Sequence, residues 1–234
     1  MLKLITLELK KNKIRSYIYA IGIITLCMLG FLYTFGMIAY LGGDADAIEF
    51  STYSNIWTLT TALHTVSYVV LMAVMFSTFI IKEYTSKITT VLFTYPIDRA
   101  YLINAKIILI AIIGMGGMLL GTIISLTIFS ATEMLFSLVP DIYTLNTIIN
   151  ILLETILCAV YSLFISIISL RIGFQKKSVQ ITIVSAIILA SCSANIISTM
   201  SYSRIPFSIT WIVIAIIAIV CYIGFIGKVR ELEI

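Results

Sequence analysis

The sequence has very little charge. Only 11% of its 234 residues are Asp, Glu, Lys or Arg, whereas about a quarter of a soluble domain is charged. A chain with so few charged residues cannot cover a water-facing surface, so soluble globular, disordered, collagen-like and disulfide-scaffold proteins are excluded. Hydrophobic residues make up 61% of the chain and the mean hydropathy is +1.12, so an integral membrane protein remains.

The apolar residues are gathered in long runs. The runs cover about 16–41, 57–81, 102–130, 146–170, 178–199 and 206–227. Each reaches the roughly 20 residues that a helix needs to cross the hydrocarbon core. None alternates polar and apolar residues as the strands of a membrane barrel do. The sequence therefore predicts an all-α integral membrane protein, a single domain of six transmembrane helices, with no cleavable signal at its start.

The basic residues predict the orientation of these helices. Thirteen of the 15 basic residues fall before the first run, after the sixth, or in the connections that follow the second and fourth runs, and Lys106 lies just inside the third run on the same side. The three opposite connections contain only Arg204. Because positively charged connections stay in the cytoplasm, both termini are predicted to be cytoplasmic.

The segment 2–15 precedes the first run. Leu2, Ile5 and Leu9 recur at helical spacing, while Lys10, Lys11 and Arg15 supply positive charge. This pattern predicts an amphipathic helix that lies on the inner membrane surface. The alternative is a basic tail that only sets the orientation.

The segment 82–104 is the longest charged connection on the cytoplasmic side. Within it Ile88, Val91, Leu92 and Tyr95 follow the i, i+3, i+4, i+7 spacing of an amphipathic helix. Pro96 ends this helix, and Asp98 caps another that starts near Arg99. A short helix held between two spans is suited to transmit force from a partner; the alternative is a plain connecting turn.

Together these features resemble the membrane subunits of ABC-2 type ATP-binding-cassette exporters. More narrowly, the chain is similar to the six-span permeases for bacitracin and lantibiotic self-protection in Gram-positive bacteria. The positions that match are Glu83, the helical run 88–93, Pro96 to Arg99, and Lys106. The chain departs from the family at Lys87 and Ile88, where a Gly-Thr pair is frequent.

The resemblance implies a bacterial plasma-membrane permease without enzymatic activity. Two copies, or this chain and a related one, would pair, and two ATPase subunits carrying ATP and Mg²⁺ would dock below. The residues that would couple to the ATPase are Glu83, Lys87, Leu92, Pro96, Asp98 and Arg99. The only Gly-Lys step, Gly227-Lys228, is followed by valine, so the chain has no phosphate-binding loop of the GxxxxGK[ST] type. We therefore expect no cofactor on this chain, and a lipid bilayer but no nucleic acid among its partners.

Two ionisable residues lie well inside predicted spans. His64 and Glu154 sit at matching depths, roughly 10–12 Å below the outer entry of the second and fourth spans. Ionisable groups inside a membrane are costly, so each is a functional candidate. One hypothesis is a polar element that they form together near the outer mouth of a substrate path; the alternative is an interhelical hydrogen bond or contact with water.

The remaining small and polar residues predict packing. Gly117 and Gly121 form a GxxxG pair, which allows close helix approach either within one subunit or between two. The four cysteines lie within spans and have no metal-ligand spacing, so no metal site is predicted.

Three functions fit these observations to different degrees. The leading one is the permease of an ATP-driven exporter for an amphipathic or hydrophobic cargo, such as an antimicrobial peptide. The second is a stand-alone membrane immunity or structural protein. The third, an intramembrane enzyme, lacks support because no HExxH or GxSxG pattern occurs.

Overall fold

The computed structural model describes residues 6–9, 14–41, 50, 52–85, 99–136, 139, 141 and 144–231. Within these ranges the chain consists of helices and short turns and contains no strand. The elements are α2 (Ile14–Leu41), α4 (Tyr53–Phe76), η1 (Ser77–Ile81), α5 (Lys82–Thr85), α7 (Arg99–Glu133), α8 (Leu145–Gln175), α9 (Val179–Ser198), η2 (Thr199–Ser201) and α10 (Ile205–Glu231). Residues 6–9 are also helical.

Six of the helical stretches are long and apolar enough to cross a membrane. They are Ile14–Leu41, Tyr53–Ile81, Ala100–Glu133, Leu145–Gln175, Val179–Ser201 and Ile205–Val229. Helices form here because hydrocarbon offers no hydrogen-bond partners, so each backbone N–H and C=O must be satisfied within its own segment. The predicted all-α fold with six candidate transmembrane helices is confirmed.

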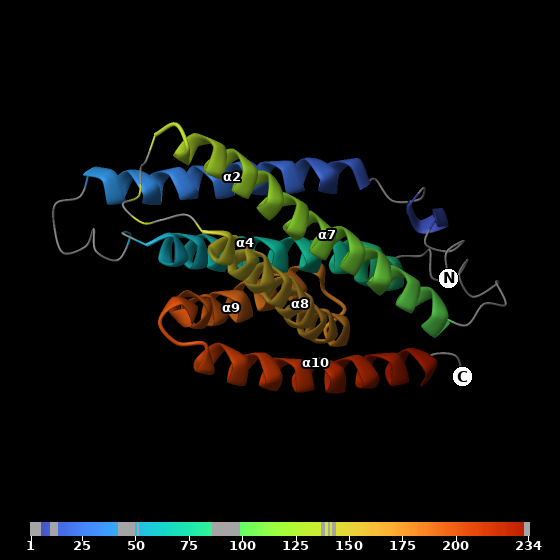
Figure 1. Ribbon diagram of the computed structural model, residues 1–234. Helices are drawn as coiled ribbons and strands as arrows, with labels where there is room; N and C mark the ends of the chain where they lie inside the picture. The colour runs from blue at the N-terminus through green and yellow to red at the C-terminus, as the bar shows by residue number, and fades with distance from the viewer. Residues whose placement is uncertain are drawn as a thin grey trace.

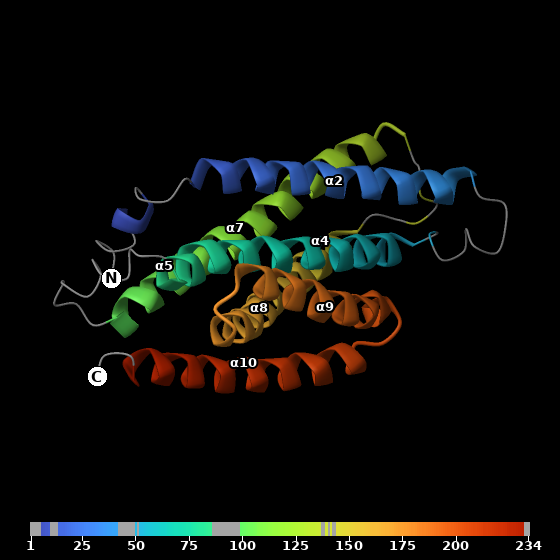
Figure 2. The same cartoon turned by 180° about the vertical axis from the view of Figure 1, so that it is seen from behind.

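The second span, α4 with η1, lies at the centre of the bundle. α2 packs on one side of it, while α8 and α9 separate it from α10 on the other side (Figures 1 and 2). In its most apolar window 72% of the residues of this span are buried, against 11% for α10. α10 therefore presents most of its surface outward.

α7 is the longest helix and runs obliquely across the others (Figure 1). Its 35 residues span about 52 Å, which exceeds the roughly 30 Å of hydrocarbon in a bilayer. The helix must therefore tilt or project beyond the hydrocarbon.

α2 begins and α10 ends at one end of the bundle, where α4 also gives way to α5 and α7 begins (Figures 1 and 2). We call this the basic end, because Lys82, Lys106, Arg171, Lys176 and Lys228 all lie in the helices or turns found there. The turn from α8 to α9 lies at the same end. Because α2 begins and α10 ends at the same end, the described helices cross the bundle an even number of times.

The opposite end is closed by aromatic packing and carboxylates. The Phe129 ring lies 5.7 Å from that of Tyr33 and 6.1 Å from that of Trp57. Glu133, at the end of α7, accepts hydrogen bonds from the Tyr53 hydroxyl at 2.6 Å and from the Val139 N–H at 2.9 Å. These contacts hold the start of α4 and the connection after α7 together.

Candidate functional site

A fully buried lysine lies at the basic end of the bundle. Lys106, on the second turn of α7, has none of its surface exposed. Its Nζ donates to the Phe79 carbonyl at 2.8 Å and to Oε2 of Glu83, and Oε1 of Glu8 lies 3.6 Å away. Two of the three ammonium donors thus make hydrogen bonds, and Glu8 adds a second negative charge at ion-pair distance. We call Glu8, Glu83 and Lys106 the buried charge cluster.

The partners of Lys106 come from three separate segments. Glu8 belongs to the helical residues 6–9, Phe79 lies in the π-helical turn η1, and Glu83 lies in α5. In that turn the Lys82 N–H bonds to the Ser77 carbonyl, five residues back. π-helical turns inside α-helices are rare and occur frequently at functional sites. The cluster joins the segment before α2, the end of the second span and the start of the third.

The buried charge cluster depends on all of its members. A buried ion pair gives little net stability over an apolar replacement, but removing one partner costs about 3–5 kcal/mol because the other charge remains buried. Here Glu8 is 5% exposed, so it cannot exchange Lys106 for water without a change in packing. The arrangement is therefore a mechanical link that holds three segments in one geometry.

The cluster lies at the two ends of the predicted coupling segment 82–104. Glu83 lies at its start and Lys106 just beyond its end, and the Glu83 carboxylate pairs with Lys106 of the same chain. Arg99 is the first residue of α7. The other predicted coupling residues, Lys87, Leu92, Pro96 and Asp98, lie outside the described residues.

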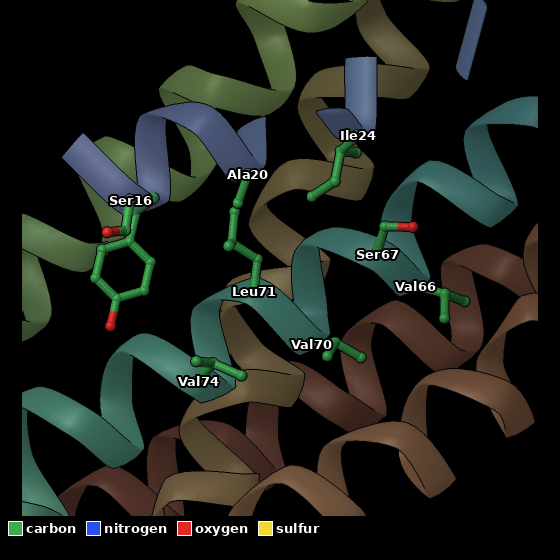
Figure 3. A pocket seen from close by; sticks show the side chains of 9 residues that line it. Ser16, Ala20, Ile24, Val66, Ser67, Val70, Leu71 and Val74 are labelled. Atoms are coloured by element: carbon green, nitrogen blue, oxygen red, sulfur yellow. The ribbon is translucent and has the colours of Figure 1, made fainter. Parts of the chain in front are cut away.

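An apolar groove of about 610 Å³ runs between α2 and α4 (Figure 3). Its walls carry mostly aliphatic side chains and two serines. The lining residues are Ser16, Tyr17, Ala20 and Ile24 of α2, and Val66, Ser67, Val70, Leu71 and Val74 of α4. Such a lining offers van der Waals contact along its length and no charged group.

The groove adjoins the buried charge cluster. The ring of Tyr17, which lines the groove, meets that of Phe79 edge to face at 5.4 Å between centroids. The Phe79 carbonyl is an acceptor for Lys106. A displacement of the cluster would therefore reach Tyr17, in the wall of the groove, through Phe79 alone.

His64 lies beyond the other end of the groove. It lines a small cavity of about 20 Å³ together with Ile24 and Ser67, both of which also line the groove. The imidazole is 2% exposed and meets the Tyr68 ring edge to face at 4.8 Å. Neither ring nitrogen has a hydrogen-bond partner in the described part of the chain.

Glu154 has a different partner from the one that its depth suggested. Its Oε1 lies 3.6 Å from Nη2 of Arg204, in the turn before α10, and its side chain is 13% exposed. Because both nitrogens of His64 are unpartnered, the suggested pair between His64 and Glu154 does not form. His64 instead lies close to Gly121 of α7.

The two glycines of the GxxxG pair lie against α2. A methyl group on Gly117 would come within 2.8 Å of Ile21 Cδ1, and one on Gly121 within 2.7 Å of Thr25 Oγ1. The absence of side chains therefore lets α7 pass close to α2 within one chain. Among the described residues no group of three His, Cys, Asp or Glu side chains could hold a metal ion.

Glu8 is the site residue that sequence reasoning missed. A signal was present, because Glu8 follows Ile5 by three residues and so shares the apolar side of the predicted N-terminal helix with Leu9. A carboxylate on an apolar stripe needs a buried partner. The other half of the signal was Lys106, the only lysine within an apolar run of the sequence.

Comparison with known proteins agrees with this architecture. The sequence model of a family described as ABC-2 family transporter protein matches residues 4–193. The chain is 25% identical over 211 residues to an uncharacterized protein of Bacillus subtilis (strain 168) named YcbO, covering 89% of this chain and 91% of that protein. No solved structure matches the chain with statistical significance.

The family match covers most of the chain, from the segment that contains Glu8 through to α9. It therefore includes the buried charge cluster, the groove, four of the six candidate spans and most of the fifth. The chain belongs to the ABC-2 family of transporter proteins and is a membrane-spanning transport component.

Proposed function

We propose that this chain is the permease subunit of an ATP-driven ABC-2 exporter, which moves an amphipathic or hydrophobic cargo, such as an antimicrobial peptide, out of a bacterial cell. A separate ATPase chain would bind ATP and Mg²⁺. Two permease copies, identical or related, would enclose the path. The observation that carries this proposal is the buried charge cluster at the two ends of the connection between the second and third spans.

The cluster suits a coupling role because of where it lies. Any force applied to the connection 86–98 enters the bundle through α5 and the start of α7, and Glu83 and Lys106 tie these two elements together. Glu8 adds the segment before α2 to the same unit. In this mechanism Glu83 positions the connection, while Asp98 at its end and Arg99 at the start of α7 contact the ATPase.

The groove supports the chemical class of the cargo. Its lining is apolar along the wall shared by α2 and α4, and it contains no group that would recognise a sugar or an ion. Movement of the cluster would reach this wall through Phe79 and Tyr17. The mechanism would then be alternating closure of two permease halves, driven from the basic end.

The test measures ATP hydrolysis and co-purification with the ATPase subunit in the native membrane. We compare the natural chain with two variants, the pair Asp98→Ala/Arg99→Ala and the single change Lys106→Met. The matched control is Lys82→Met, which removes an exposed positive charge from the same end. We expect the Asp98/Arg99 pair to lose the bound ATPase. Lys106→Met should retain the ATPase, but its rate of cargo-stimulated ATP hydrolysis should fall at least about tenfold. This fall corresponds to a coupling free energy within the usual range for linked sites.

The control should behave as the natural chain does. If a chain that never binds an ATPase still protects cells from the peptide, the export proposal is wrong and a stand-alone immunity protein is correct. If Lys82→Met and Lys106→Met reduce hydrolysis equally, the effect is one of charge alone and the cluster has no part in coupling.

A further inference from the structure

Arg171 is a half-buried cation that the proposed transport mechanism does not use. It lies on α8, four residues before the helix ends at Gln175. Its guanidinium faces α10, where a methyl group placed on Gly224 would come within 3.5 Å of Nη2 and 3.8 Å of Cζ. Nη1 is buried and has no hydrogen-bond partner in the part of the chain that the structure describes.

A guanidinium in this position needs an acceptor. It keeps its charge at all physiological pH values, and a buried N–H donor without a partner costs free energy. No ion pair of Arg171 is formed with the described residues either. The acceptor must therefore come from outside these residues.

The depth of Arg171 indicates which acceptor is present. Four residues of helix correspond to about 6 Å, so the guanidinium lies just inside the end of a spanning helix, at the level of lipid headgroups. Lys228 follows Gly224 by four residues and so lies on the same side of α10, further toward the basic end. Phosphate oxygens match the planar donor pair of an arginine, which binds them bidentately.

The neighbouring surface suits acyl chains. Ile216, Val220 and Ile223 follow helical spacing on α10 and are 57%, 65% and 64% exposed. Gly224 matters because a larger side chain would occupy the space over the α10 backbone that the guanidinium faces. The seam between α8 and α10 thus combines two cations, Arg171 and Lys228, at headgroup depth with an apolar stripe beside them.

We infer that the seam between α8 and α10 at the basic end binds the phosphate of an anionic phospholipid. Because Nη1 is buried, Arg171 supplies two parallel hydrogen bonds from Nε and Nη2, which lie over Gly224. Lys228 supplies the second positive charge, and the acyl chains lie along α10. Basic pockets between transmembrane helices recognise anionic headgroups in this way. This site is separate from the groove and does not depend on the proposed export function.

The test measures which lipids stay bound. The purified full chain is placed in nanodiscs of phosphatidylglycerol and phosphatidylcholine in equal amounts, and retained lipid is identified by native mass spectrometry after mild delipidation. We expect phosphatidylglycerol to be retained several-fold over phosphatidylcholine. Arg171→Gln should reduce this preference about fivefold, the factor that one lysine or arginine near an anionic surface contributes.

Two further variants separate a built site from general charge. Gly224→Leu keeps every charge but fills the space beneath the guanidinium, and it should also abolish the preference. Lys177→Asn is the matched control: it removes a charge from the α8–α9 turn at a position with φ of 50°, which asparagine tolerates. The control should retain the preference.

Several results would overturn the inference. Equal retention of the two lipids by the natural chain would do so, as would an unchanged preference in Arg171→Gln and Gly224→Leu. An equal loss in Lys177→Asn would mean that diffuse charge attracts the lipid. Displacement of the lipid by millimolar inorganic phosphate would mean that the seam binds a free anion instead.

Discussion

At the scale of single residues, Lys106 is the position where a substitution should cost the most free energy of unfolding. A lysine without exposed surface is tolerated only because its donors and charge are matched by Phe79, Glu83 and Glu8. Its removal takes the buried ammonium away from both carboxylates. The cost of a substitution should therefore depend on which charges remain.

We predict that Lys106→Met lowers the free energy of unfolding by about 3–5 kcal/mol, the usual cost of stranding a buried charge. The triple change Glu8→Gln, Glu83→Gln and Lys106→Met removes every charge of the cluster. It should recover most of that loss, because the two carboxyl groups that faced the missing ammonium are then neutral. Thermal unfolding in detergent, followed by the fluorescence of Trp57 and Trp211, measures both.

The triple variant separates the effect on stability from the effect on function. The triple variant should fold but fail in cargo-stimulated ATP hydrolysis, since the mechanical link between the segments is lost. Unfolding at the same temperature for the single and triple variants would show that lost packing, and not stranded charge, sets the cost at Lys106.

At the scale of elements, the sequence predicts where the spans lie better than it predicts which side chains of different spans contact each other. Each span follows from composition, because hydrocarbon selects apolar helices of sufficient length. His64 and Glu154 were both correctly placed inside helices, but their depth alone suggested a contact. Each successive residue turns a helix by about 100°, so the contacts of a side chain depend on helix rotation and packing, which a single sequence does not disclose.

The buried charge cluster illustrates the same limit. Glu83 and Lys106 stood out in the sequence as family positions, but their mutual contact arises only where α5 and α7 approach each other. Glu8 is almost a hundred residues away from Lys106 and reaches it through the packing of the N-terminal helical residues 6–9. No sequence signal predicts the π-helical turn at Ser77–Ile81.

α8 and α9 approach each other closely beside the turn that joins them. The Ser178 N–H bonds to the Gly173 carbonyl and the Lys177 N–H to the Phe174 carbonyl, with Lys177 at φ of 50°. This is the Schellman arrangement that ends a helix. A methyl group on Gly173 would overlap Thr182, at 1.7 Å from its Oγ1 and 2.8 Å from its Cβ.

We therefore predict that Gly173→Ala destabilises the protein by about 1–3 kcal/mol, the typical cost of overpacking. Thr182 cannot rotate away without losing its hydrogen bond to the Ser178 carbonyl. Gly116→Ala is the matched control, because nothing lies within 4 Å of the added methyl group. It should be neutral or stabilising by up to about 1 kcal/mol. Equal melting temperatures for the two variants would contradict a close approach of α8 and α9 at this point.

At the scale of the whole molecule, charge and arrangement agree. The elements carrying Lys82, Lys106, Arg171 and Lys228 meet at the end where α2 begins and α10 ends (Figure 2). That end also carries the buried charge cluster and the Arg171 seam. If it faces the cytoplasm, the ATPase contact and the anionic lipid site lie on the side where ATP and anionic headgroups are found.

We predict from the positive-inside rule that the basic end faces the cytoplasm, and cysteine labelling measures this directly. Ser203→Cys places a thiol in the exposed turn before α10, and Lys176→Cys places one in the exposed turn after α8, at the opposite end. In intact cells a membrane-impermeant maleimide should label the Ser203→Cys variant at once and the Lys176→Cys variant only after permeabilisation. The natural chain, whose four cysteines lie in candidate spans, gives the background. The reverse pattern would place the connection 86–98 outside the cell, where no ATPase could reach it, and the export mechanism would fail together with the topology.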